Sequence, residues 1–143
     1  HGRGDELTQL EPFSGIPVVI ANPGFQVSTA WAYGSLRDLG LTRERKSANI
    51  LVGKMQRRDV SDVEEKLFNI FESVVMEEHP LVRRIKEEFI RAGASGVLMT
   101  GSGPTVFALA QDASSAQVIR EQVGHIADFC IVTRTSGTSI TRM

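Results

Sequence analysis

The chain is arranged around the stretch Gly93-Ala-Ser-Gly-Val-Leu-Met-Thr-Gly-Ser-Gly-Pro-Thr-Val-Phe-Ala-Leu109. Its two apolar runs, Val97–Met99 and Val106–Ala110, are short and are separated by small residues and one proline. Short apolar runs bounded by Gly and Pro are typical of buried strands. The sequence therefore predicts two strands joined as a hairpin at this point.

The turn of this hairpin, residues 100–105, has almost no side-chain bulk. Glycine tolerates positive φ angles and lets a ligand come close to the backbone. Successive free amides in such a turn can form a concave site for an anion, and hydroxyl groups from Thr100, Ser102 and Thr105 would add donors. A turn whose glycines serve only its tight geometry is the alternative, because a lone glycine-rich turn is a weak signal.

Composition limits the class of protein. The chain has 143 residues, of which 41% are hydrophobic and 23% charged, as expected of one globular domain. A formal net charge of −1 gives no reason to expect nucleic acid as a partner. Neither a run of about 18 apolar residues nor a signal peptide is visible, so we expect no membrane span and a cytoplasmic location.

Histidine and cysteine, the residue types that most often bind zinc, are few. The three histidines, at positions 1, 79 and 125, lack the spacing of metal ligands, and we expect no metal site. The single cysteine, Cys130, lies in an apolar run and is interpreted as a buried structural thiol.

Hydrophobic periodicity and turn residues predict the remaining elements. Strands are expected at 16–21 and 129–133, and helices at 28–39, 47–56, from 59 through 75, 80–93 and 114–123. The predicted order β-α-α-α-α-β-β-α-β favours an α+β fold. We expect a ferredoxin-like (split βαβ) antiparallel sheet of about four strands with extra helices.

Apolar residues at helical spacing identify candidate core positions. In the first helix these are Ala32, Leu36 and Leu39, whereas Trp31 and Tyr33 point elsewhere. The candidates in the two later helices are Leu81, Ile85, Phe89, Ile90, Ala116, Val118, Ile119 and Val123.

The hairpin stretch also resembles the third motif of the GHMP small-molecule kinases. Within that family, three further segments are similar to the 4-diphosphocytidyl-2-C-methyl-D-erythritol kinases. They read Gly2-Arg-Gly-Asp-Glu-Leu-Thr-Gln-Leu10, Asn22-Pro-Gly-Phe-Gln-Val-Ser-Thr-Ala-Trp-Ala-Tyr33 and Leu67-Phe-Asn-Ile-Phe-Glu72. The resemblance covers nearly the whole chain, with the segments in the expected order.

The resemblance implies an ATP-dependent kinase that uses Mg²⁺. It would phosphorylate the 2-hydroxyl of the cytidine diphosphate-methylerythritol substrate, 4-diphosphocytidyl-2-C-methyl-D-erythritol, in non-mevalonate isoprenoid biosynthesis. Family members bind ATP through a Gly-Leu-Gly-Ser-Ser-Ser-like loop and act through a Lys and an Asp, all in an N-terminal domain. None of these motifs is present here. The resemblance therefore implies a C-terminal domain at 13–143, a tail of the N-terminal domain at 1–12, no catalytic residue in this chain, and an inactive fragment.

The resemblance also implies roles for particular residues. Gly101, Ser102, Gly103 and Thr105 would border the phosphates and methylerythritol, and Tyr33 would stack on cytosine. Thr29 and Pro23 would lie on the same wall of the site.

Each role has a structural alternative. Tyr33 could be an exposed aromatic residue and Thr29 only a helix cap. We expect Asn69 and Glu72 simply to link helix surfaces. A non-catalytic small-molecule-binding module and another GHMP kinase, such as homoserine kinase, remain alternatives for the whole chain.

Overall fold

The computed structural model describes residues 12–39 and 67–137. The strands are β1 (Pro17–Asn22), β2 (Gly96–Met99), β3 (Val106–Leu109) and β4 (Phe129–Arg134). The helices are α1 (Thr29–Asp38), α3 (Glu72–Glu78), α4 (Pro80–Arg91) and α5 (Ala113–Val123). The helix expected at 47–56, and the 59–66 part of the following one, lie outside the described residues.

The strands form one antiparallel sheet in the order β2-β3-β1-β4. This order, with β2 and β3 joined as a hairpin, is the split βαβ arrangement, so the predicted fold class is confirmed. Strand β1 lies between β3 and β4, and its Val18, Val19 and Ala21 are buried. Its continuous β-branched sequence is explained by this central position.

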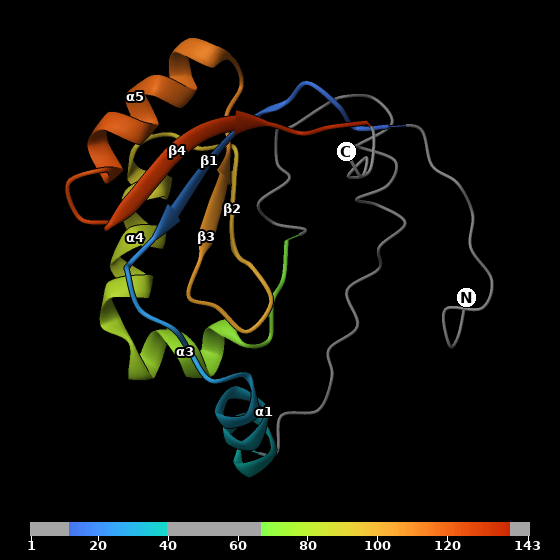
Figure 1. The fold of residues 1–143 in the computed structure, drawn as a ribbon, viewed down its shortest axis with the longest axis vertical. Coiled ribbons are helices and arrows are strands. Elements are labelled where there is room, and N and C mark those ends of the chain that lie inside the picture. Colours follow the sequence, from blue (N-terminus) through green and yellow to red (C-terminus); the bar gives the residue numbers. More distant parts are fainter. Residues whose placement is uncertain (1–11, 40–66, 138–143) are drawn as a thin grey trace, which may run out of the picture.

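Helices α4 and α5 cover one face of the sheet (Figure 1). Ile85 and Phe89 of α4, and Ala116, Ile119 and Val123 of α5, are fully or almost fully buried there, as predicted. Apolar residues spaced three or four apart lie on one side of a helix and make this contact.

Three of the predicted core residues are wrong. Ile90 is 42% exposed, Val118 48% and Leu39 55%. Ile90 and Val118 each adjoin a buried position, Phe89 and Ile119, and one step along a helix turns a side chain about 100° away. Leu39 is the C-cap residue at the end of α1 and is exposed there.

Cys130 is only partly buried, because β4 is an edge strand. Its Sγ lies 3.9 Å from the carbonyl oxygen of Arg120. Burial raises the pKa of the Cys130 thiol, which favours the unreactive protonated form. A structural thiol agrees with this environment, although it is less buried than the sequence suggests.

One end of the sheet gathers segments that are distant in sequence. The β2–β3 turn, the end of β1, and helices α1 and α3 all lie there (Figure 1).

The predicted continuous helix through residue 75 is wrong at 67–71, because α3 begins only at Glu72. The Asn69 side chain accepts a hydrogen bond from the Phe71 N–H at 3.0 Å, which favours a turn over a helix.

Candidate functional site

The turn between β2 and β3 is closed by two backbone hydrogen bonds. Thr100 N–H donates to the Thr105 carbonyl at 2.8 Å, and Gly103 N–H donates to the Thr100 carbonyl at 2.9 Å. Gly101 and Gly103 have φ angles of 49° and 83°, in the left-handed region that glycine adopts without strain. The predicted tight turn is thus present, with both glycines in the conformation that requires them.

Three amides of the turn make no hydrogen bond within residues 12–39 and 67–137. They belong to Gly101, Ser102 and Thr105, none of which is buried. Exposed N–H groups gathered in one turn are suited to binding anionic oxygen, as in other backbone anion sites. The turn contains no ionisable side chain, so its attraction for an anion would not depend on pH.

Gly103 also packs closely against the core. A Cβ at this position would lie 2.7 Å from Met99 Sδ and 3.3 Å from Val75 Cγ1. The absence of a side chain therefore lets the turn fold down onto β2 and α3.

Two polar contacts connect the β2–β3 turn to helix α1 and to the end of β1, which form the opposite wall of the candidate site. Thr29 Oγ1 lies 2.9 Å from Ser102 Oγ, and Asn22 Nδ2 donates to Thr105 Oγ1 at 2.8 Å. The cap alternative for Thr29 is wrong, since Ser28 is the N-cap and accepts from Trp31 N–H.

Pro23 and Tyr33 occupy different parts of this wall. Pro23 is buried and offers little of its surface to solvent. Tyr33 is 59% exposed, and its ring meets Phe71 edge-on with 4.9 Å between centroids. Because Thr29 and Tyr33 are four residues apart on α1, they lie on the same side of that helix.

The sequence interpretation missed the role of Asn69 and Glu72. Both bind backbone atoms in or just after β2, and Glu72 in addition links α3 to α4 through Lys86, so the expected helix link is confirmed for Glu72 and wrong for Asn69. Asn69 Nδ2 donates to the carbonyls of Met99 and Gly101, each at 2.7 Å, and Glu72 Oε1 accepts from Met99 N–H at 2.9 Å. The available signal was a polar Asn among the apolar residues of Leu67–Phe71.

Asn22, which directly follows the predicted strand at 16–21, was not among the predicted site residues. Its Oδ1 accepts from Gly24 N–H at 2.8 Å while its Nδ2 reaches Thr105. The Asn-Pro-Gly sequence signalled the local turn but carried no sign of the contact to Thr105, 83 positions away.

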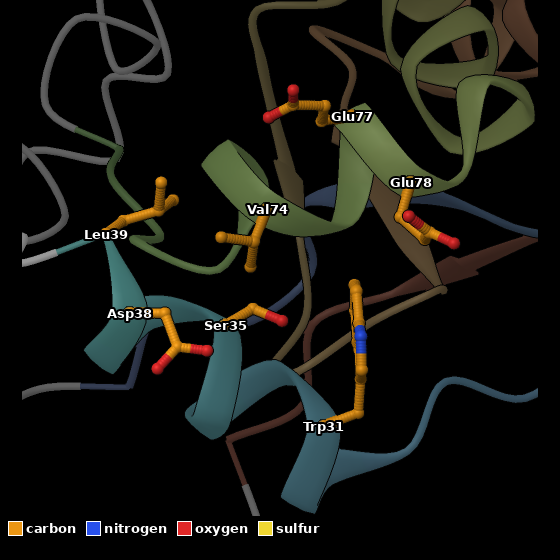
Figure 2. A pocket seen from close by; sticks show the side chains of 7 residues that line it. All are labelled: Trp31, Ser35, Asp38, Leu39, Val74, Glu77 and Glu78. Carbon is orange, nitrogen blue, oxygen red and sulfur yellow. The ribbon is translucent and has the colours of Figure 1, made fainter.

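A separate pocket of about 310 Å³ lies between α1 and α3 (Figure 2). Trp31, Ser35 and Asp38 line it from α1, and Val74, Glu77 and Glu78 from α3. The misassigned Leu39 borders it as well. None of the residues that the sequence singled out for binding lines this pocket.

Two observations concern metals and membranes. Among residues 12–39 and 67–137, no three His, Cys, Asp or Glu side chains are grouped as a metal site would require. No helix in these two ranges has the length and hydrophobicity to cross a membrane.

The sequence matches known proteins over nearly its whole length. Residues 51–126 match the family described as GHMP kinases C terminal. The chain is 37% identical over 135 residues to 4-diphosphocytidyl-2-C-methyl-D-erythritol kinase from Pelotomaculum thermopropionicum, covering 94% of this chain and 47% of that protein. It is 39% identical over 132 residues to the kinase of the same name from Geobacter metallireducens, covering 92% and 45%. It thus spans about half the length of these relatives.

Solved structures share the fold. A crystal structure of 4-(cytidine 5'-diphospho)-2C-methyl-D-erythritol kinase has a TM-score of 0.74 at 22% identity, covering 96% of this chain and 48% of that one. L. major mevalonate kinase in complex with R-mevalonate has a TM-score of 0.72 at 15% identity, covering 98% and 48%. At these identities the likeness concerns the fold, whereas the sequence match of residues 51–126 concerns the family. The chain therefore belongs to the GHMP kinase C-terminal family.

Proposed function

We propose that this chain is the substrate-side domain of an ATP-dependent kinase. Its substrate would be 4-diphosphocytidyl-2-C-methyl-D-erythritol, phosphorylated on the 2-hydroxyl for non-mevalonate isoprenoid biosynthesis in the cytoplasm. The observation that carries the proposal is the glycine turn, in which the amides of Gly101, Ser102 and Thr105 make no hydrogen bond within residues 12–39 and 67–137 and none of these three residues is buried. The kinases of that name at 37% and 39% identity support the choice of substrate.

The free amides of the turn would hold the anionic oxygens of the substrate. Phosphoryl transfer depends chiefly on positioning and on stabilising negative charge, and fixed N–H groups do both without reorganising. The Ser102 hydroxyl, held beside Thr29, would add one more donor. Because Gly103 has no side chain, the turn packs close against Met99 and Val75, which would leave room for the substrate.

The other end of the substrate would lie against α1. Tyr33 presents an exposed ring that is supported from one side by Phe71. A pyrimidine base stacks favourably on such a ring. Tyr33 would therefore hold the cytosine, with Thr29 and Pro23 forming the wall between the base and the turn.

ATP, bound with Mg²⁺, would supply the transferred phosphoryl group. The glycine turn fits a phosphate oxygen through its N–H groups. The turn at 100–105 carries no carboxylate, and no group of three or more Asp, Glu, His or Cys side chains that could hold a metal ion lies among the described residues, so the turn does not fit the metal. We therefore assign Mg²⁺ and most ATP contacts to an N-terminal kinase domain, with 13–143 as the C-terminal domain and 1–12 as a tail from the preceding one.

The test compares the full-length natural polypeptide containing this sequence with residues 1–143 alone. We expect ATP-dependent phosphorylation of 4-diphosphocytidyl-2-C-methyl-D-erythritol only by the full-length protein. Homoserine and mevalonate, assayed in parallel, should not be phosphorylated. Phosphorylation of homoserine instead would contradict the substrate assignment, and phosphorylation by residues 1–143 would contradict the assignment of catalysis to another domain.

A further inference from the structure

Both backbone polar groups of Met99 are bonded to side chains from another part of the chain. The Met99 N–H donates to Glu72 Oε1 at 2.9 Å, and its carbonyl accepts from Asn69 Nδ2 at 2.7 Å. Met99 is the last residue of β2, an edge strand. Because the next residue, Thr100, is hydrogen bonded across the hairpin, the N–H and C=O of Met99 face away from β3. The two side chains thus cover the open edge of the sheet where the glycine turn begins.

Each hydrogen bond that the structure gives the Asn69 side chain goes to a backbone atom. One amide nitrogen bonds the carbonyls of Met99 and Gly101, each at 2.7 Å, while Oδ1 accepts from Phe71 N–H at 3.0 Å. The reversed amide would set its oxygen against two carbonyls, so these partners fix its orientation. Asn69 therefore holds the peptide groups on both sides of Thr100.

Glu72 is held in place from the opposite direction. Its second oxygen, Oε2, lies 2.7 Å from Lys86 Nζ on α4, and the two side chains are only 16% and 23% exposed. Each carboxylate oxygen thus has its own partner, one on the strand and one on a helix. Lys86 makes no hydrogen bond to the turn among the described residues, but its ion pair orients the Glu72 carboxylate.

We propose that Asn69 and Glu72, with Lys86 orienting Glu72, are positioning residues for the glycine turn at 100–105. They hold the turn in the form that exposes its free amides. For what the turn binds, this inference rests on the proposed function. The positioning itself does not depend on that function.

The same residues connect the two halves of the proposed site. Asn69 fixes the Phe71 backbone, and the Phe71 ring supports Tyr33. A displaced Asn69 would disturb the turn directly, and it would disturb the Tyr33 ring through Phe71. The distance between the base end and the phosphate end is therefore set in part by a residue that need not contact the substrate.

Two variants of the full-length protein test the inference. Asn69→Asp replaces two donors with an oxygen facing two carbonyls at almost unchanged size. Glu72→Gln removes the charge that pairs with Lys86. The matched controls are Gln117→Glu, an exposed amide-to-acid change on α5, and Glu88→Gln, which removes an acid paired with Arg91 on α4.

The first measurement is the amide NMR spectrum without ligand. We expect N69D and E72Q to shift or broaden the signals of Gly101, Ser102 and Gly103, and the controls to leave them in place. The second measurement is the affinity for cytidine diphosphate together with kcat and KM. Both variants should weaken cytidine diphosphate binding about tenfold, because the displaced turn no longer presents its free amides to the phosphate oxygens.

Lys86 keeps the inference testable if N69D fails to fold. We expect Lys86→Met to move the Met99 amide signal and to weaken nucleotide binding, and Lys86→Arg to restore both. In the double variant E72Q/K86M the losses should not add, since both changes break one contact.

The outcomes separate the inference from the proposed function. Turn signals that stay unchanged in folded N69D, E72Q and K86M would overturn the positioning role. Displaced turn signals with unchanged cytidine diphosphate affinity would support the positioning role and overturn phosphate binding by the turn.

Discussion

Thr29 Oγ1 and Ser102 Oγ lie 2.9 Å apart, although 73 positions separate them in the sequence. The bond attaches the first residue of α1 to the middle of the glycine turn. Since Ser28 caps the helix, the Thr29 hydroxyl is free for this contact. This hydrogen bond thereby links α1 to the turn of the hairpin.

Breaking this bond should reveal energetic coupling between the two residues. We expect Thr29→Val and Ser102→Ala each to lower the free energy of unfolding by no more than about 1 kcal/mol, because the pair is exposed. Urea denaturation of the single and double variants should show a coupling of about 0.5 kcal/mol. As a control, Thr29→Val combined with Ser114→Ala on α5 should be additive. Additivity of T29V and S102A would mean that the bond does not form in solution.

Gly103 should be far less tolerant of alanine than a glycine with the same backbone angle. Gly15 has φ +82° and no atom within 4 Å of the position that a Cβ would take, whereas Gly103 has φ +83° and Met99 Sδ at 2.7 Å. Gly15→Ala should therefore cost about 1–2 kcal/mol from backbone strain alone. Gly103→Ala should lose about 1–3 kcal/mol more because of overpacking. Urea unfolding midpoints measure both, and equal losses would show that Met99 moves aside freely.

Adjacent residues of α4 offer a test of the core. Phe89 is fully buried and Ile90 is 42% exposed. Phe89→Ala should lower the free energy of unfolding by about 3–5 kcal/mol, since it removes a ring from the packed interior. Ile90→Ala should change it by no more than about 0.5 kcal/mol, as is usual at the surface. Guanidinium denaturation distinguishes the two, and a loss at Ile90 comparable to that at Phe89 would indicate that Ile90 packs against another surface.

The sheet was predictable because its signals are local. The runs Val97–Met99 and Val106–Ala110 are apolar and separated by a turn that contains two glycines and a proline. The β-branched run that follows Ile16 lies in the central strand, as expected. The errors at Ile90 and Val118 arose where two apolar residues adjoin. Hydrophobic periodicity does not determine which of two adjacent apolar residues faces the core. The packing of the helix on the sheet determines it.

The support of the glycine turn was not predictable in the same way. Asn69 and Glu72 bind backbone atoms 27 to 32 positions further along the chain. Every residue except proline presents the same N–H and C=O groups, so the sequence at Met99 does not indicate its partners. The turn itself was foreseen from its glycines, whereas the side chains that hold it were visible only in the fold.

Asp112 provides a prediction about pH. It is the N-cap of α5, and its Oδ1 accepts from Ser115 N–H at 2.7 Å. This backbone hydrogen bond, which favours the carboxylate, holds the pKa of Asp112 below its ordinary value of 3.8. A lowered folded-state pKa means that the stabilisation is complete above pH 3.8 and is lost as pH falls through the lower folded value.

Asp112→Ala should accordingly lower the melting temperature by a few degrees near neutral pH, with the gap to the unmodified protein closing in acid. Asp112→Asn keeps the acceptor without the titration, so its advantage over D112A should stay constant in thermal scans from about pH 6 to about pH 2. A gap between the unmodified protein and D112A that stays constant over the same range would show that the Asp112 carboxylate does not bind Ser115 more strongly than the carboxylic acid does.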